Sequence, residues 1–216
     1  MRRLTRLCCA SAVLAAISAP VFAGDITTEW ASVKAPPAPE LKPVTVYPKT
    51  TALLVLDFMK GNCGQRPRCL ATIPNVKKLL DTARAQNMMI IYTLVGQDPT
   101  PAGMVDQSLA PHANDFIVKG PTGAGDKFIS SNLDEGLKEK GIRTVILTGT
   151  SAQVAVGGTA NSAAQRGYKP VVPVDGMSSE DAYNEQYAAW HIYKGGSQVL
   201  VKNATLTRSD LIKFGN

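Results

Sequence analysis

The sequence is poor in the two residue types that most often bind transition metals. Its 216 residues include only four cysteines and two histidines. His112 and His191 lie far apart in the sequence, and no cysteine lies near either of them. A structural zinc site needs four ligands that come mostly from closely spaced Cys and His residues. We therefore expect no metal site, and no motif indicates a bound cofactor.

A strong excess of positive charge is also missing once the first 23 residues are set aside. The chain has 23 Lys and Arg against 17 Asp and Glu, a formal charge of +6. Three arginines and no acid lie in the first 23 residues, so the remainder has 20 basic and 17 acidic residues, a charge of +3. Nucleic-acid-binding domains carry a basic stripe, often with interleaved aromatic residues. This sequence has none, and we expect no nucleic-acid partner.

The first 23 residues have the pattern of a secretory signal peptide. Arg2, Arg3 and Arg6 precede a short apolar run, and Val21-Phe22-Ala23 has the small-residue pattern of a cleavage site. We predict a signal peptide at 1–23 and a periplasmic or secreted protein, with an N-terminal membrane anchor as the alternative. No later segment has the roughly eighteen unbroken apolar residues of a membrane-spanning helix. We therefore expect no membrane association after removal of the signal.

Removal of this segment leaves only two cysteines, Cys63 and Cys69, six positions apart. Two cysteines around Gly and Pro in an exported protein indicate a local disulfide bond, with two free thiols as the alternative. Closing so short a loop stabilises the fold by roughly 2 kcal/mol on the chain-entropy estimate.

Two parts are expected in the remaining chain. Residues 24–50 contain five prolines, which disfavour a regular helix, so we predict an extended arm there and a single folded domain at 51–216. In the domain, apolar runs predict strands at 51–57, 88–95, 115–119, 143–149, 169–175 and 198–202, and helical patterns cover 73–83, 131–141, 152–166 and 180–194. This alternation is typical of an α/β fold in which helices cover both faces of a parallel sheet.

Ligands bind such sheets at the carboxyl ends of the strands. This rule selects Asp57, Lys119, the turn after Gly149, and Asp175. A carboxylate directly after an apolar strand, such as that of Asp57, is costly unless it is paired or solvated. Asp57 and Lys119 are therefore a candidate acid–cation pair. A turn or helix-cap role for the acid and a solvated lysine are the alternatives.

Two glycine-containing segments follow. At 148–160 a strand turns directly into a helix of small residues, and such a helix start favours an anion, although simple helix–sheet packing is the alternative. The segment 120–127 imitates a phosphate-binding loop, but Asp126 separates Lys127 from the last glycine. We expect no nucleotide there, but a mobile loop beside the site.

Three segments together, in this order, resemble the isochorismatase-like superfamily, which includes cysteine hydrolases such as nicotinamidases. They are the apolar strand ending in Asp57, the strand ending in Lys119 with Phe128 nearby, and the segment from Thr148 to Tyr168, followed by Pro-Val-Asp175. The likeness covers about residues 50–205. It implies a three-layer fold with a six-stranded parallel sheet between helices, and it implies that the protein forms homo-oligomers.

The resemblance also implies roles for individual residues. Asp57 matches the catalytic acid/base, and Lys119 matches the lysine that supports it. The nucleophilic cysteine of the family is expected at position 155, which is Ala155 here and has no group to form a thioester. Some members without the cysteine, true isochorismatases among them, hydrolyse a vinyl ether with the aspartate as proton donor. That route is open to Asp57.

We therefore expect an exported hydrolase that acts on a small anionic molecule by non-covalent acid/base chemistry. The residues expected to bind the substrate are Ser151, Gln153, Val154, Lys60 and Lys127. The alternative is a catalytically inactive pseudoenzyme that binds a small carboxylate or a partner protein. A nucleophilic Ser151 or Thr150 is a third possibility, disfavoured because a hydroxyl needs an adjacent base and no histidine is near in the sequence.

Overall fold

The computed structural model describes residues 24–94, 103–121 and 123–216, so the predicted signal peptide lies outside the described residues. The chain divides into two compact units, the first ending at Pro36 and the second spanning Pro37–Asn216. The first unit contains α1 (Ile26–Glu29), which begins where the Asp25 side chain accepts hydrogen bonds from two backbone N–H groups. The expected extended arm is therefore helical here, since Asp25 caps a stretch without proline.

The end of the expected arm belongs to the second unit. β1 (Val44–Val46) pairs in parallel with β9 (Ile212–Phe214), the last strand of the chain. Val46 and Ile212 are buried with one face of the main sheet. The folded body consequently starts earlier than residue 51. The prolines around β1 disfavour a helix, but they do not prevent this short strand from pairing with β9.

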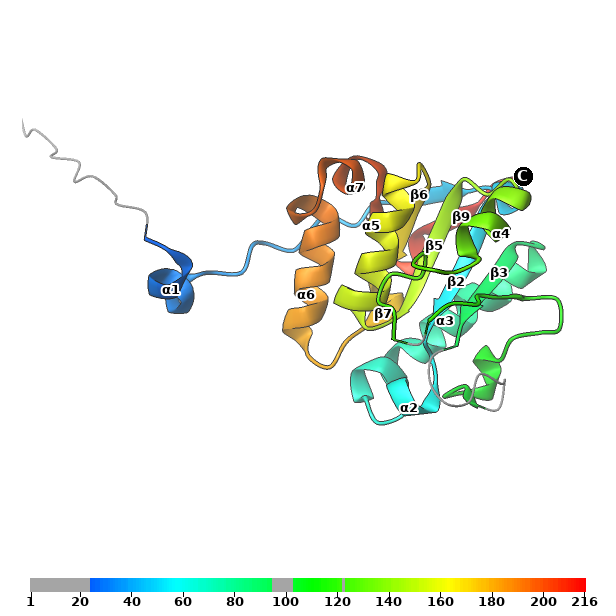
Figure 1. Ribbon diagram of the computed structural model, residues 1–216, viewed down its shortest axis with the longest axis horizontal. Coiled ribbons are helices and arrows are strands. Elements are labelled where there is room, and N and C mark those ends of the chain that lie inside the picture. The colour runs from blue at the N-terminus through cyan, green and yellow to red at the C-terminus, as the bar shows by residue number, and fades with distance from the viewer. Residues whose placement is uncertain (1–23, 95–102, 122) are drawn as a thin grey trace, which may run out of the picture. The chain divides into compact units, whose positions relative to one another are not determined.

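The main sheet has six strands in the order β4-β3-β2-β5-β6-β8, and the short β7 pairs with the end of β5 (Figure 1). Every pair is parallel. The strands are β2 (Thr51–Leu56), β3 (Met89–Thr93), β4 (Phe116–Ile117), β5 (Thr144–Thr150), β6 (Lys169–Pro173), β7 (Met177–Ser178) and β8 (Thr205–Thr207). The predicted α/β class and parallel sheet are confirmed.

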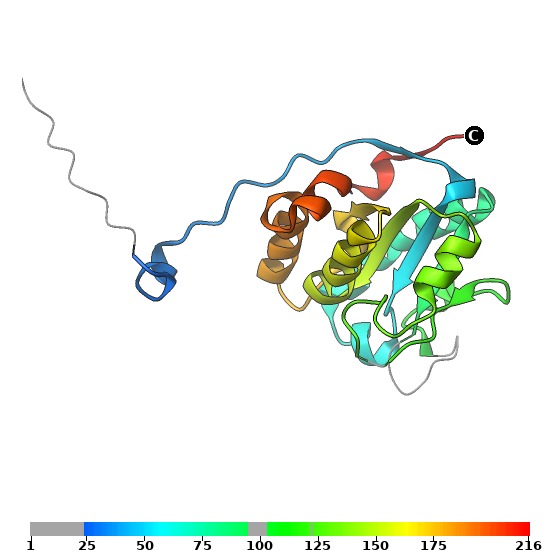
Figure 2. The same ribbon diagram turned by 45° about the horizontal axis from the view of Figure 1, so that its top comes forward.

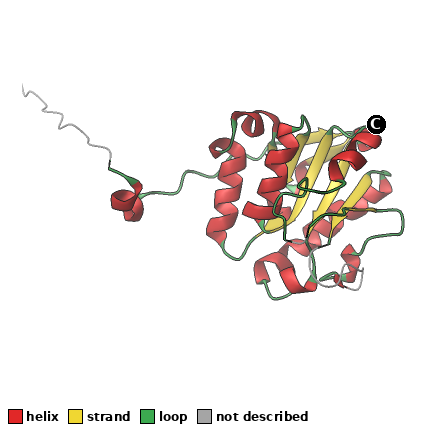
Figure 3. Cartoon of the chain, viewed as in Figure 1, coloured by secondary structure: helices red, strands yellow, loops and turns green. Residues whose placement is uncertain are grey.

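Helices cover both faces of this sheet (Figures 2 and 3). They are α2 (Lys60–Cys63), α3 (Pro67–Ala85), α4 (Leu133–Glu139), α5 (Gly157–Gln165), α6 (Ala182–Trp190) and α7 (Gln198–Asn203). Side chains of β2 alternate between two cores: Leu54 and Leu56 pack with α4 and α5, whereas Leu53 and Val55 pack with α3. This alternation explains why β2 is apolar throughout, since both of its faces are covered.

One expected strand is wrong. Residues 198–202 form helix α7, and the sixth strand is β8, a few residues later. The hydroxyl of Ser197 accepts a hydrogen bond from the backbone N–H of Leu200 at 3.2 Å, which caps α7. A short apolar run is compatible with a strand or with a buried helix, and here the cap at Ser197 favours the helix. No helix in the described residues is both long and apolar enough to cross a bilayer.

Candidate active site

Asp57 directly follows β2 and lies at the carboxyl edge of the sheet. Its backbone N–H donates to the carbonyl oxygen of Thr93 at 3.1 Å, which continues the pairing of β2 with β3. Its φ of 61° turns the chain out of the strand, in a region that Asp tolerates better than most residues. The residue is only 4% exposed. The strand end therefore fixes a carboxyl group in a nearly dry environment.

Both carboxylate oxygens of Asp57 have a partner. The hydroxyl of Thr93, at the end of β3, donates to Oδ1 at 2.6 Å. The ammonium of Lys127 lies 2.7 Å from Oδ2, and the Lys127 side chain is only 7% exposed. The same ammonium donates to the carbonyl oxygen of Ala124 at 2.8 Å. A buried ion pair needs such additional hydrogen bonds to offset the loss of hydration.

Helix α5 holds the loop that carries Lys127. The backbone N–H of Lys127 donates to the hydroxyl of Thr159 at 3.1 Å, and the hydroxyl of Ser162 donates to the neighbouring Asp126. A Cβ atom at Gly125 would lie 2.6 Å from a side-chain methyl of Val154, so this loop approaches the helix start closely at the glycine. The expected mobile loop is thus bound to α5, and Lys127 is positioned by the helix it packs on.

The expected pair of Asp57 with Lys119 is not formed, and Lys127 takes that place. Along β4 and the residues after it, Phe116 and Val118 are half-buried, whereas Ile117 and Lys119 are exposed. Because side chains alternate along an extended chain, Lys119 falls on the solvent side. Its backbone N–H donates to Asn132 at 2.8 Å. Lys127 is buried instead, in the loop that hydrogen-bonds to Thr159 of α5.

The turn after β5 also reaches this edge. Leu56 is paired with Gly149, so Asp57, which follows β2, and Thr150, the last residue of β5, come next to each other at this edge of the sheet. Gly149 has a φ of 146°, and a Cβ atom there would lie 2.4 Å from the carbonyl oxygen of Leu56. The peptide bond between Thr150 and Ser151 is cis. A π-helical turn (Ala152–Val156) then leads into α5.

The expected substrate-binding residues differ in their surroundings. Ala155, where the family cysteine is expected, is 2% exposed in this turn. Gln153 accepts a hydrogen bond from the hydroxyl of Ser179 at 2.8 Å. Ser151 is half-buried, whereas Val154 and Lys60 are exposed. Lys127, also expected to bind substrate, forms the buried ion pair with Asp57.

A small cavity of about 30 Å³ lies beside Lys127 and Thr93. Its walls include Ala124 and Ser131, so polar groups from the lysine loop and β3 face it. A cavity of this size with several polar neighbours has room for a water molecule. A water molecule can therefore reside next to Lys127 and Thr93, the two partners of Asp57.

Burial has the largest influence on Asp57 and raises the pKa of its carboxyl group above the ordinary value. The charge of Lys127 and the hydrogen bonds from Lys127 and Thr93 lower that pKa and only partly offset the burial. A dry site disfavours the charged form of an acid. The geometry can therefore hold a proton on Asp57 at a higher pH than for an exposed aspartate.

The predicted disulfide bond is present and follows Asp57 closely. Cys63 and Cys69 are bonded, with their Cα atoms 5.4 Å apart, and both are fully buried. The bond joins α2 to α3. Both cysteines of the described chain are thereby oxidised, so neither supplies a thiol to Asp57.

Charged residues near this bond are paired with each other. Arg66 lies 2.9 Å from Glu180, and Arg68 forms an ion pair with Glu185. These carboxylates offset the two arginines near the expected site. Asp175, also selected from the sequence, accepts hydrogen bonds from the N–H and hydroxyl of Ser209 and so anchors the C-terminal segment instead.

Sequence reasoning missed two threonines that complete the site. Thr93 and Thr159 are both buried and hold Asp57 and Lys127, respectively. Thr93 could have been found, because it ends a strand at the same edge of the sheet as Asp57. Thr159 carries no such signal, since its partner is a backbone group of a distant loop. Among the described residues, no cluster of His, Cys, Asp and Glu could hold a metal ion.

Comparison with known proteins assigns the family. The model of the isochorismatase domain matches residues 51–203. The isochorismatase family protein YwoC of Bacillus subtilis is 28% identical over 153 residues, which cover 60% of this chain and 78% of YwoC. The secreted isochorismatase effector Isc1 of Verticillium dahliae is 28% identical over 153 residues, covering 64% of this chain and 78% of Isc1.

A solved structure agrees with this assignment. The crystal structure of a cysteine hydrolase from Pseudomonas syringae superimposes with a TM-score of 0.67 at 21% identity, covering 80% of this chain and 94% of that one. At this identity the likeness concerns the fold. Because the domain model matches well over half of the sequence, the chain belongs to the isochorismatase family.

Proposed function

We propose that this protein is an exported hydrolase that acts on a small anionic molecule by acid/base chemistry at Asp57, without a covalent intermediate. The observation that carries the proposal is the buried pair of Asp57 and Lys127 at the carboxyl edge of the sheet. Ala155, at the position where the family resemblance places the nucleophile, supports a route without a thiol. Family membership agrees with a small-molecule substrate.

The hydrolysis of a vinyl ether is a reaction that fits these groups. Asp57 in its acid form donates a proton to the double bond, and the resulting cation is attacked by water. The water returns its surplus proton to the Asp57 carboxylate, and the hemiketal then separates into a carbonyl compound and an alcohol. Lys127 stabilises the carboxylate between these steps, and the raised pKa of Asp57 favours the acid form needed for the first.

The anionic character of the proposed substrate rests on one lysine and one helix start near Asp57. Lys60 begins α2 next to the site and is exposed, and the small-residue turn with Ser151, Gln153 and Val154 leads into α5. A helix start favours negative charge. Arg66 and Arg68 no longer contribute, because Glu180 and Glu185 offset their charges.

The assignment of Asp57 and Lys127 is tested by three variants. Asp57→Asn keeps the shape of the side chain but removes the acid, and we expect it to abolish turnover of any vinyl ether substrate found. Lys127→Met should lower kcat strongly, whereas Lys119→Met should leave it nearly unchanged because Lys119 is exposed. Full activity of Asp57→Asn, or a larger loss for Lys119→Met than for Lys127→Met, would contradict the proposed roles.

A second function is an inactive binding protein that retains the site around Asp57 without its chemistry, and Ala155 favours it. It would bind a small carboxylate or a partner protein. A panel of amides and vinyl ethers with no turnover, together with thermal stabilisation by a carboxylate, would select this function. Stabilisation must then grow with ligand concentration.

Export and self-association complete the proposal. The relative Isc1 is described as secreted, and the first 23 residues have the pattern of a signal peptide. N-terminal sequencing of the exported protein should begin at Gly24. Tyr183 and Tyr187 of α6 are 70% and 42% exposed, and such an aromatic face suits a homo-oligomer. Sedimentation of the mature protein measures this directly.

A further inference from the structure

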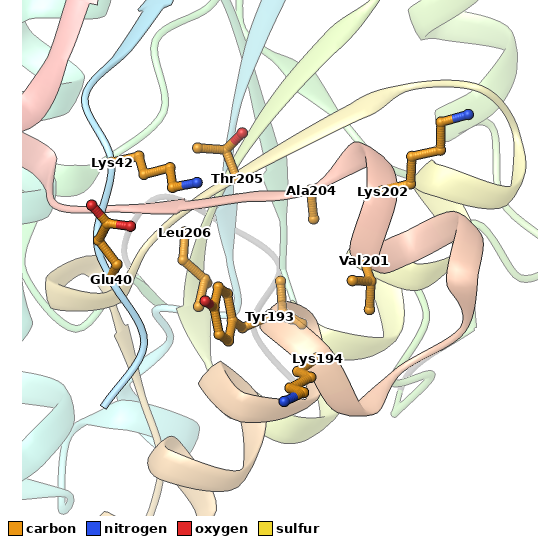
Figure 4. A pocket seen from close by; sticks show the side chains of 10 residues that line it. Glu40, Lys42, Tyr193, Lys194, Val201, Lys202, Ala204, Thr205 and Leu206 are labelled. Atoms are coloured by element: carbon orange, nitrogen blue, oxygen red, sulfur yellow. The ribbon is translucent and has the colours of Figure 1, made fainter. Parts of the chain in front are cut away.

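A groove of about 490 Å³ lies beside β8, the edge strand of the sheet (Figure 4). Three segments line it: the chain before β1, the π-helical turn after α6, and α7 with the start of β8. None of its residues belongs to the site around Asp57, whose strand β2 is separated from β8 by β5 and β6. The volume falls within the range of small-molecule sites, about 300–1,000 Å³.

Positive charge prevails around this groove. Lys42, Lys194 and Lys202 each come from a different lining segment, and Glu40 is the single acidic residue of the lining. None of the three lysines forms an ion pair with the protein within the described ranges. In Figure 4 the Lys42 side chain extends toward Thr205, whereas the ammonium groups of Lys194 and Lys202 point in other directions, that of Lys202 away from the other two. The rim therefore attracts an anion from several sides.

The groove also has apolar walls. Ile192 and Leu206 are 1% and 5% exposed, so they form its base, and Tyr193 is 44% exposed. Figure 4 shows the Tyr193 ring beside Leu206. Val201 of α7 adds a further aliphatic surface. An inorganic anion would leave these side chains unused, whereas a molecule with an apolar body would cover them.

The walls are held in place by hydrogen bonds. The backbone N–H of Lys42 donates to the carbonyl oxygen of Leu206 at 3.1 Å, which fastens the chain before β1 to β8. The hydroxyl of Ser197, which caps α7, lies 3.1 Å from both Asn161 and Gln165 of α5. A groove between fixed segments loses little entropy when a ligand enters.

We propose that this groove binds a free amphipathic organic anion, with its acidic head group at the lysine-bearing rim and its apolar body against Ile192, Tyr193 and Leu206. The cationic rim selects the charge and the buried base selects the apolar body. The proposal is independent of the chemistry at Asp57.

Octanoate and octan-1-ol are suitable probes because they share a chain and differ in charge. Calorimetric titration of the full mature protein at neutral pH should show tighter binding of octanoate. The triple variant Lys42→Gln, Lys194→Gln, Lys202→Gln should weaken octanoate binding at least about tenfold, since charged hydrogen bonds of this kind are lost. Octan-1-ol binding should change less than about twofold, because the apolar base remains.

A matched control replaces Lys49, Lys78 and Lys169 by Gln, three exposed lysines outside the groove. It should bind octanoate like the wild type. Equal weakening in both triple variants, or equal affinity for octanoate and octan-1-ol, would overturn the proposal. So would lysine-dependent sedimentation with phosphatidylglycerol vesicles in the absence of octanoate binding, because the anion would then be a membrane surface. Thermal unfolding verifies that both variants are folded.

Discussion

Lys127 and the three groove lysines carry the same charge in opposite surroundings. Lys127 is 7% exposed and its ammonium lies 2.7 Å from Asp57, whereas Lys42, Lys194 and Lys202 are exposed and have no carboxylate partner among the described residues. A buried charge must find its partner inside the protein, because water cannot replace it. The difference indicates that Lys127 serves the acid beside it, while the groove lysines remain available to a ligand from outside.

The largest effect is expected when the buried pair is broken. Lys127→Met leaves Asp57 without its ion partner, and loss of one member of a buried pair destabilises a fold by about 3–5 kcal/mol. Lys202→Met, at the exposed groove, should change the free energy of unfolding by less than about 0.5 kcal/mol. Urea unfolding near neutral pH measures both. Similar losses of unfolding free energy in the two variants would show that the burial of Lys127 has no energetic consequence.

The next largest effect concerns how tightly the chain is packed beside Asp57. Gly149→Ala places a Cβ atom 2.4 Å from the Leu56 carbonyl oxygen in a backbone conformation that alanine avoids. We expect a loss of about 2–4 kcal/mol in the free energy of unfolding, from strain and overlap together. Gly61→Ala is the control, because nothing lies within 4 Å of a Cβ atom there. Equal thermal stability of the two variants would show that β2 and β5 can separate at no cost.

A smaller loss is expected for the disulfide bond that follows Asp57. The double variant Cys63→Ser, Cys69→Ser should lower the free energy of unfolding by roughly 2 kcal/mol, since the loop that it closes is short. Wild-type protein treated with a reductant should approach the same value, and the double variant should not respond to the reductant. If the reductant lowered the stability of both proteins equally, the loss would not come from the Cys63–Cys69 bond.

The smallest effect is a pH dependence that belongs to Asp57 alone. Because its pKa is raised in the folded protein, the folded state binds the proton more strongly than the unfolded state does. This stabilisation is complete below the unfolded pKa and is lost as the pH rises through the folded pKa. It amounts to about 1.4 kcal/mol for each unit by which the pKa is raised.

The comparison of wild type with Asp57→Asn at several pH values isolates this contribution. The difference in unfolding free energy should favour the wild type most at low pH and should shrink as the pH rises. The groove variant Lys202→Met should retain the wild-type dependence. A difference that grows with rising pH would indicate that the pKa of Asp57 is lowered.

Sequence patterns predicted the features that depend on local order. β2 and the acid at its end follow from one apolar run, and the disulfide bond follows from two cysteines in a short loop. The partner of Asp57 could not be predicted in the same way. Lys119 lies on the exposed side of an extended segment, whereas Lys127 is buried in a loop that is hydrogen-bonded to α5. The prediction of a strand at 198–202 was wrong for another reason. An apolar run of five residues is compatible with both a strand and a helix.

The groove could not be predicted from the sequence at all. Its lysines come from positions 42, 194 and 202, and only the pairing of the Lys42 backbone with β8 brings the first near the others. No spacing in the sequence encodes that contact. Sites assembled from distant segments by tertiary packing are therefore the hardest to predict from a sequence.

Asp57 is a buried acid: burial favours its protonated form, and Lys127 stabilises its charged form. Carboxyl-carbon NMR of labelled aspartate, with Asp57→Asn to assign the signal, measures the pKa of Asp57 directly. We expect a pKa above that of an exposed aspartate in the wild type, and a higher pKa still in Lys127→Met. A wild-type pKa at or below the ordinary value, or no change in Lys127→Met, would contradict it.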